Sequence, residues 1–394
     1  MTNQKNKQKK VFVRTFGCQM NVRDSEVVLG LLKNAGYIII DDPKKADIVL
    51  FNTCSVRQHA EDRVWSEIGT FAKLKRGDSP RKTGTVPIIG LLGCMAQEHK
   101  EKAFERMENI DLVVGPSDIE KIPAIIKKIL AHREKNKSQD LFGYKIWETD
   151  GEKRPDEIYH SGFYEDKNHA YVVISEGCAN YCSYCVVPYV RGEPRNRSHK
   201  DILNEVKEAT KKGITKITLL GQNVNAYKDH DVDFVELLTQ INAIKALDEL
   251  SFFTSHPKDT SVKLFEAMRD LEKVKKHLHL PIQSGSDRIL KLMNRNYNLN
   301  FYLDLVDKYR KIVTGGTLST DIIVGFPSEA EEDFKDTFDL VKKVKFNSAY
   351  IFKYSPRVYT EAAKFADSIS KEEKEKRHAA ILDLQRKISK QLKK

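Results

Sequence analysis

The six cysteines of this chain fall into two sets of three, and the second set has a spacing that suits an iron-sulfur cluster. Cys178, Cys182 and Cys185 lie within one short stretch, whereas the first three cysteines are far apart in the sequence. Cysteine thiolates hold iron-sulfur clusters, and a cluster of four irons normally takes four of them. No seventh cysteine exists, so one iron must be open or must take a different ligand. An open iron can bind a small molecule, and the spacing therefore predicts a reaction centre.

Two other interpretations of these cysteines are weaker. A structural zinc site needs four ligands, and the second set offers three with His199 as the nearest downstream fourth candidate. Disulfides would leave at least one thiol of each set without a partner. A long chain without a secretion signal also favours metal ligands or redox groups over disulfides. An iron-sulfur cluster is the favoured interpretation, with zinc as the alternative.

The first part of the chain alternates strand-like apolar runs with helix-like stretches, which is typical of a parallel βαβ sheet. One or two residues separate the end of each run from a cysteine. The runs are residues 11–16, 46–51 and 86–92, and the cysteines are Cys18, Cys54 and Cys94. In open parallel sheets the ligand crevice lies at the carboxyl ends of the strands. We therefore expect these three thiols to converge on one edge of the sheet.

A second alternation of strands and helices follows a polar stretch. The strand candidates are residues 170–174, 217–220, 250–253, 277–281, 318–324 and 349–352. Such βα units fit a partial or full parallel barrel. The sequence thus predicts an α/β protein with two domains, residues 9–131 and 164–394, joined by a linker at 132–163. The second domain should end in an amphipathic helix from Lys371 onward, with Ile381, Leu384, Ile388 and Leu392 at helical spacing.

Polar residues gather where the strands of the predicted barrel end, which is where parallel barrels carry their active sites. Those that we expect to bind a cofactor are Tyr184, Gln222, Ser255, Gln283 and Asp321. Tyr184 lies between two cysteines and could present its ring to a nucleoside, and Asp321 lies inside an apolar strand and needs a partner. Strand ends also meet solvent and are polar for that reason alone. His277 and His279 share one strand face, either as metal ligands or as hydrogen-bonded core histidines.

The chain of 394 residues carries a net charge of +11, which favours a polyanionic partner, although lysines also simply solvate helix faces. Candidate contacts to phosphate or substrate are Arg191, Arg195, Arg197 and Arg357. No apolar run approaches the length of a membrane span and no signal peptide precedes the first strand. We therefore expect a cytoplasmic protein with no membrane partner.

At this point the sequence resembles the radical S-adenosylmethionine enzymes in its Cys178 loop, and the methylthiotransferases among them over residues 10–390. The matching motifs are residues 15–21, 52–57, 93–97, 186–193, 220–227, 254–257, 279–286 and 319–327. In detail they resemble the subfamily that acts on isopentenyladenosine in tRNA. Two other subfamilies act on threonylcarbamoyladenosine in tRNA and on an aspartate of a ribosomal protein.

The resemblance implies two [4Fe-4S] clusters, one held by Cys178, Cys182 and Cys185 and one by the three amino-terminal cysteines. It also implies a partial (β/α)6 barrel and two molecules of S-adenosylmethionine per turnover. The free iron of the first cluster would bind one of them and release a 5′-deoxyadenosyl radical. The difficult chemistry then belongs to the cofactor, and no side chain is expected to be catalytic by itself. The second cluster would carry sulfur to C2 of the adenosine.

The partners implied by the resemblance are a tRNA carrying N6-isopentenyladenosine, an electron donor protein and a sulfur donor, and we expect a monomer. Family members usually continue into a small carboxy-terminal β-barrel that binds RNA, whereas this sequence stops at Lys394 on the tail helix. We expect that barrel to be absent. A non-catalytic, metal-stabilised RNA-binding protein is the competing class, and it predicts zinc in place of iron.

Overall fold

The computed structural model describes residues 8–55, 58–75, 86–136 and 143–392. The chain divides into two compact units. The first contains the residues up to Glu165 together with Tyr189–Arg191, and the second contains Asp166–Pro188 and the residues from Gly192 onward. Each unit is described by itself.

The first unit is built on one parallel six-stranded sheet with the order β2-β1-β3-β4-β5-β6. Its strands are β1 (Lys10–Thr15), β2 (Ile38–Ile39), β3 (Ile48–Thr53), β4 (Ile88–Gly93), β5 (Leu112–Val114) and β6 (Ile146–Glu148). The central strands β3 and β4 are buried along their whole length. Parallel strands covered on both faces need continuous apolar sequence, and this is why these two runs were recognisable.

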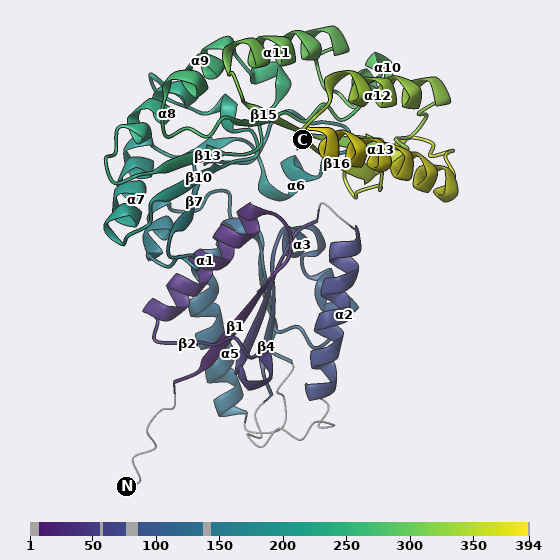
Figure 1. The fold of residues 1–394 in the computed structure, drawn as a ribbon. Helices are drawn as coiled ribbons and strands as arrows, with labels where there is room; N and C mark the ends of the chain where they lie inside the picture. The colour runs from purple at the N-terminus through teal and green to yellow at the C-terminus, as the bar shows by residue number, and fades with distance from the viewer. Residues whose placement is uncertain (1–7, 56–57, 76–85, 137–142, 393–394) are drawn as a thin grey trace. The chain divides into compact units, whose positions relative to one another are not determined.

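Helices cover both faces of this sheet (Figure 1). They are α1 (Gln19–Asn34), α2 (Gln58–Lys75), α3 (Cys94–His99), α4 (Lys102–Arg106) and α5 (Ile122–Lys135). Helices α1 and α5 contact one another, and Trp65 and Ile68 of α2 pack with Phe51 and Leu91 of the sheet in one apolar core. Successive strand residues point to opposite faces, so the two faces of the sheet bury different residues.

Within the stretch 132–163, expected as a linker, the described residues 132–136 and 143–163 contain regular structure. Helix α5 runs on to Lys135, β6 extends the sheet, and a 3-10 turn, η3 (Asp156–Ser161), packs against α1. Arg23 of α1 donates hydrogen bonds to the carbonyls of Tyr159 (2.8 Å) and Phe163 (3.1 Å). A three-residue edge strand has too few residues to show a period, so the pattern could not reveal it.

The second unit contains two parallel three-stranded sheets, β13-β10-β7 and β14-β15-β16. The strands are β7 (His169–Val173), β10 (Lys216–Leu220), β13 (Glu249–Phe252), β14 (His277–His279), β15 (Thr317–Val324) and β16 (Ser348–Lys353). All six lie where the sequence predicted them, within two residues at each end, and they confirm the parallel α/β architecture. Two short antiparallel pairs complete the strands: β8 (Ser175–Glu176) with β9 (Arg195–Asn196), and β11 (Lys228–Asp229) with β12 (Val232–Asp233).

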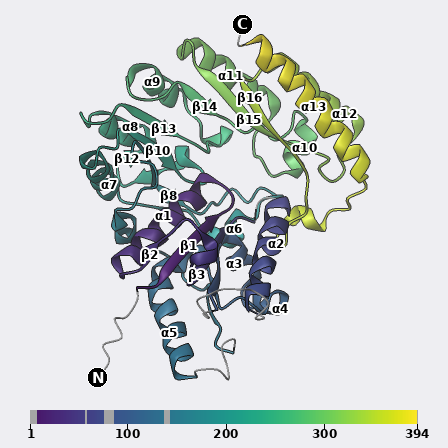
Figure 2. The same cartoon turned by 60° about the horizontal axis from the view of Figure 1, so that its bottom comes forward.

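Helices follow the strands of the second unit and lie along their outer side (Figures 1 and 2). They are α7 (His199–Lys211), α8 (Phe234–Asn242), α9 (Val262–Asp270), α10 (Asp287–Leu292), α11 (Leu299–Ile312) and α12 (Glu331–Val344). The short α6 (Val187–Arg191) follows the cysteine loop, and its residues Tyr189–Arg191 belong to the first unit. The predicted tail helix is α13 (Lys371–Gln391), which packs on α12 and β16 with Ile381 and Ile388 buried. In the described part of the chain, no helix combines the length and apolar character needed to cross a bilayer.

One glycine at the end of a central strand allows β4 to turn directly into the helix that begins at Cys94. Gly93 has φ +84° and ψ −152°, a conformation that only glycine adopts readily. A Cβ at Gly93 would lie 2.6 Å from the carbonyl oxygen of Thr53, a backbone atom that cannot rotate away.

We predict that Gly93→Ala lowers the free energy of unfolding by about 2 kcal/mol or more beyond the loss caused by Gly36→Ala. Gly36 is the matched control because it has φ +89°, and a Cβ added there would have no atom within 4 Å. It therefore reports the cost of a side chain at positive φ without a close contact. Urea denaturation of both variants measures the difference, and equal losses would show that the Thr53 contact does not matter.

Candidate functional site

The strand-end argument correctly predicted that the three amino-terminal thiols would come together. Cys18 follows β1, Cys54 follows β3 directly, and Cys94 begins the helix after β4. A hydrogen bond from the Cys54 side chain lowers the pKa of Cys18 to about 6, although burial opposes this shift. Burial raises the pKa of Cys94, and the neighbouring Cys18 adds to that rise. The three sulfur atoms thus share one electrostatic environment.

Two buried asparagines fix the loops that carry these thiols. Asn21 accepts a hydrogen bond from the Cys18 thiol (3.3 Å) and donates one to the carbonyl of Thr53 (2.8 Å). Asn52 in turn donates to the carbonyl of Asn21 (2.8 Å). Both side chains are almost fully buried, so the bonds are made in a setting where an unpaired amide would be costly. Sequence reasoning missed this role because the two residues are far apart in the chain.

A buried carboxylate joins two arginines beside the same thiols. Asp24 lies 2.7 Å from a guanidinium nitrogen of Arg154 and 2.7 Å from one of Arg191, and all three side chains are buried. Burial raises the pKa of Asp24, but the two guanidinium groups outweigh this effect and the pKa is lowered. Arg191 also hydrogen-bonds Cys94 and opposes the burial that raises the pKa of that thiol. The first unit therefore places a cation among its cysteines.

The cysteines of the second unit lie on a loop that is held from both sides. Gly177 has φ +80°, and a Cβ there would lie 2.2 Å from the carbonyl oxygen of Glu193, so the loop requires glycine at this point. Its backbone N–H donates to Gln222 (2.6 Å), and the N–H of Cys178 donates to the carbonyl of Gly192 (3.0 Å). The predicted cofactor residue Gln222 thus positions the loop.

The three thiols on this loop also lie close enough to influence one another. Burial raises the pKa of Cys185 to about 12, and the charges of Cys182 and Cys178 add to the rise. None of the six cysteines, all in described stretches, is joined in a disulfide. A set of neighbouring thiols without a nearby fourth cysteine is the donor chemistry that an iron-sulfur cluster with one open iron requires.

Several buried polar atoms at the strand ends have no hydrogen-bond partner in the described part of the chain. They are Asn223 Oδ1 after β10, Ser255 Oγ and His256 Nε2 after β13, and the hydroxyl of Tyr354 after β16. Buried polar atoms normally have partners, and each exception calls for an explanation. A polar small molecule at the carboxyl ends of these strands would supply those partners, as the prediction for Ser255 requires.

The other residues predicted to bind a cofactor have mixed surroundings. Tyr184 packs against the apolar cluster of Ile289, Met293 and Phe326 and is only partly buried. Gln283 is buried and has φ +74°, and its carbonyl accepts from the N–H of Ile323.

The partner that Asp321 needs is His279, at 3.4 Å. His279 also hydrogen-bonds Ser319, and His277 bonds Thr317 and Ser319. Of the two interpretations given for His277 and His279, metal ligands or hydrogen-bonded core histidines, these contacts match the second.

The four arginines proposed as substrate contacts differ in exposure. Arg191, Arg197 and Arg357 are buried, and Arg197 bonds Glu205 and the carbonyl of Val173 (2.6 Å each). Arg195 is partly exposed and lies 3.4 Å from Glu176. A phosphate contact needs an accessible cation, and Arg195 is the most accessible of the four. The substrate contacts of all four arginines stay a prediction.

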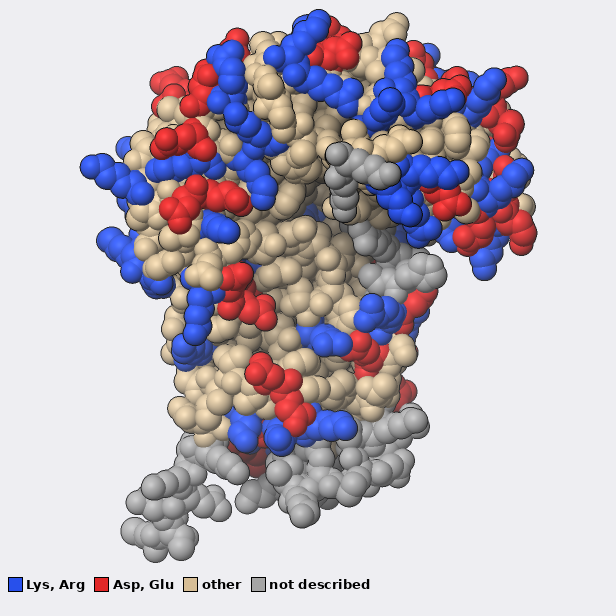
Figure 3. Space-filling model, in the orientation of Figure 1, with Lys and Arg blue, Asp and Glu red and all other residues tan. Residues whose placement is uncertain are grey.

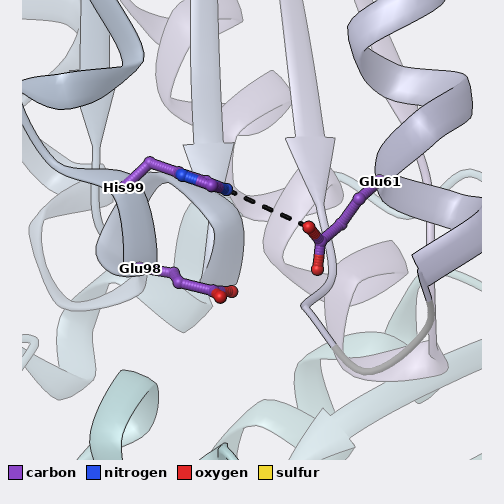
Figure 4. Close-up of side chains that lie close together, drawn as sticks. All are labelled: Glu61, Glu98 and His99. Carbon is purple, nitrogen blue, oxygen red and sulfur yellow. Dashed lines mark ion pairs between the residues drawn. The ribbon is translucent and has the colours of Figure 1, made fainter. Parts of the chain in front are cut away.

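A further group of potential metal ligands in the first unit was not predicted. Glu61 of α2 and Glu98 and His99 of α3 place three donor atoms within 4.8 Å of one another (Figure 4). His99 Nε2 lies 4.0 Å from Glu61, and burial lowers the pKa of the imidazole. His99 also packs edge-on against Trp65 of α2. These contacts join the helix after Cys54 to the helix that begins at Cys94.

Two family models match the chain. Residues 172–341 match the radical SAM superfamily, and residues 10–115 match the family described as uncharacterized protein family UPF0004. Among solved structures, the radical S-adenosylmethionine methyltransferase TsrM from Kitasatospora setae has a TM-score of 0.60 at 14% identity, covering 90% of this chain and 77% of that one. The cobalamin-dependent S-adenosylmethionine radical enzyme OxsB has a TM-score of 0.56 at 13% identity, covering 98% of this chain and 56% of that one. The fold and the cysteine loop are those of a radical SAM protein.

Two curated relatives narrow this class. A tRNA-2-methylthio-N(6)-dimethylallyladenosine synthase from Thermoanaerobacter sp. (strain X514) is 44% identical over 394 residues, covering 98% of this chain and 80% of the relative. A protein of the same name from Thermodesulfovibrio yellowstonii is 41% identical over 379 residues, covering 96% and 84%. The chain belongs to the family of tRNA-2-methylthio-N(6)-dimethylallyladenosine synthases. The expectation of a radical SAM methylthiotransferase is confirmed at this level.

We predict that Asp24→Asn lowers the free energy of unfolding by about 3–5 kcal/mol at pH 7, because it leaves two buried guanidinium groups without their carboxylate. The pKa of Asp24 is lowered in the folded state, so its stabilisation is present above the ordinary carboxyl pKa and is lost as the pH falls through the lowered value. Denaturation of the wild type and the variant from pH 7 downward should therefore converge at acid pH. Glu67→Gln, which breaks an exposed pair with Arg14, is the control and should cost less than about 1 kcal/mol. A similar loss of unfolding free energy in both variants would contradict the role of Asp24 as the counter-ion of Arg154 and Arg191.

Proposed function

We propose that this chain adds a methylthio group to C2 of N6-isopentenyladenosine next to the anticodon of tRNA. The observation that carries the proposal is the presence of two separate thiol triads, one at the carboxyl ends of parallel strands and one on the loop after β8, in a chain of this family. One triad would suffice for radical cleavage of S-adenosylmethionine. The second gives the chain a place to hold the sulfur that the product contains.

Cys178, Cys182 and Cys185 would hold the first cluster. When bound, that cluster and S-adenosylmethionine supply a 5′-deoxyadenosyl radical, which activates a carbon that no ordinary base can deprotonate. The chain positions these groups: Gln222 and Gly177 fix the loop, and the buried Ser255 and His256 offer polar atoms to a ligand at the strand ends. The substrate adenosine must leave its stack to reach this site, which single-stranded loops allow.

Cys18, Cys54 and Cys94 would hold the second cluster. Asn21 and Asn52 fix two of the three cysteine loops, and Arg191 places a positive charge beside Cys94. This cation would partly balance the negative charge of three thiolates. Two molecules of S-adenosylmethionine are used in each turnover, one as the radical source and one as the methyl donor. An electron donor protein and a sulfur donor complete the requirements.

The tRNA partner is supported by charge only in a general way. Lysines and arginines are spread over the face seen in Figure 3, with acidic residues among them, and they do not gather into a single patch there. The net charge of +11 still favours a polyanion over the whole chain.

We predict that Cys178→Ala abolishes reductive cleavage of S-adenosylmethionine, because it removes a ligand of the first cluster. Cys18→Ala should retain that cleavage and lose methylthio transfer, because it leaves Cys178, Cys182 and Cys185 intact and removes a ligand of the other cluster. Anaerobic assays that quantify 5′-deoxyadenosine separate the two variants.

Nucleoside mass spectrometry of tRNA measures transfer, in a strain that lacks its own enzyme and expresses each variant. The wild type should produce 2-methylthio-N6-isopentenyladenosine. Methylthio product from Cys18→Ala would contradict the proposed division of work. A mark on threonylcarbamoyladenosine or on a ribosomal protein would assign the chain to another subfamily.

A further inference from the structure

A buried arginine that no sequence motif indicated contacts the second cysteine loop. Arg295 follows α10 and is 4% exposed. One of its nitrogens donates to the sulfur of Cys182 (3.3 Å) and to the hydroxyl of Tyr184 (3.4 Å). The other N–H groups donate to the hydroxyl of Tyr297 (2.9 Å) and to the carbonyl of Pro281 (2.9 Å).

Two residues just before Arg295 also hydrogen-bond the cysteine loop, Met293 through its backbone carbonyl and Asn294 through its side-chain amide. The N–H of Ser183 donates to the carbonyl of Met293 (3.0 Å). Asn294 donates to the carbonyls of Asn180 (3.2 Å) and Tyr181 (2.9 Å). The position of the guanidinium relative to Cys182 is therefore set by contacts on both sides of it.

Among the described residues, no carboxylate balances the charge of this arginine. Arginine keeps its proton at every pH that proteins tolerate, so burial does not neutralise it. No carboxylate of the described chain forms an ion pair with Arg295, and its hydrogen-bond acceptors are two phenols, a carbonyl and a thiol. A buried charge without a counter-ion is strongly unfavourable. The one acceptor in this set that becomes an anion when it binds a metal is Cys182.

We propose that Arg295 is the counter-charge of the cluster held by Cys178, Cys182 and Cys185, and that it makes this cluster easier to reduce. The proposal rests on the function proposed above, because it needs a cluster in this triad. Hydrogen bonds to the ligating sulfur atoms and the local net charge set the potential of such clusters. Reduction adds negative charge, so a fixed cation at a ligand sulfur stabilises the reduced form more than the oxidised form.

The test is the midpoint potential of this cluster, followed by electron paramagnetic resonance in full-length protein whose three amino-terminal cysteines are changed to alanine. In Arg295→Gln the potential should become more negative, with the equilibrium constant for reduction falling about tenfold or more, which is about 59 mV for one electron. Arg295→Lys keeps the charge and should recover part of the loss. Arg288→Gln is the matched control, because Arg288 is half exposed and paired with Asp333 in the same unit. It should leave the potential unchanged.

A second measurement separates a role toward the cluster from a purely structural one. Without metal, Arg295 lacks an anion, so Arg295→Gln should leave the unfolding midpoint of the apo protein unchanged or raised. The same substitution should speed the loss of iron from the loaded protein. An unchanged potential at full iron content, or an apo protein unfolded by the substitution, would overturn the proposal. If the parent protein assembles no four-iron cluster in this triad, the proposed function itself fails, and that outcome is distinct.

Discussion

Like charges brought into contact are the main constraint on this molecule. Each of the two triads gathers three thiols that must all become thiolates when they bind a metal. Without metal, burial and neighbouring sulfur atoms raise the pKa of Cys94 and Cys185, whereas the hydrogen bond from Cys54 lowers the pKa of Cys18. The first unit gathers its three thiols at the carboxyl ends of parallel strands, where loops from separate strands meet, whereas the second unit carries its three on one loop after β8.

Both triads are accompanied by a buried guanidinium group. Arg191 hydrogen-bonds Cys94 in the first unit, and Arg295 donates to Cys182 in the second. The two differ in one respect: Arg191 is also paired with Asp24, whereas Arg295 forms no ion pair with a carboxylate in the described chain. A cation that is already paired contributes less to a nearby cluster than one that is not. The electrostatic influence on the second-unit triad should therefore be the stronger.

The sequence predicted much of this arrangement because its signals are local. The cysteine spacing of residues 178–185 and the apolar runs of β3, β4 and β15 need no knowledge of distant contacts. The position of ligand sites at the carboxyl ends of parallel strands also predicted that Cys18, Cys54 and Cys94 would lie close together. The regular structure within residues 132–163, the Asp24 group and Arg295 could not be predicted, because each depends on a contact between segments far apart in sequence. Arg295 looks like one more basic residue in a polar run, and only its burial shows that its charge needs an anion.

The account depends most on one iron of the Cys178, Cys182 and Cys185 cluster having no protein ligand. Mössbauer spectroscopy of protein loaded with iron-57, with Cys18, Cys54 and Cys94 changed to alanine, measures this directly. Addition of S-adenosylmethionine should change the spectrum of about one iron in four, because only the open iron can accept it. A spectrum unaffected by S-adenosylmethionine, or zinc in place of iron, would contradict the account.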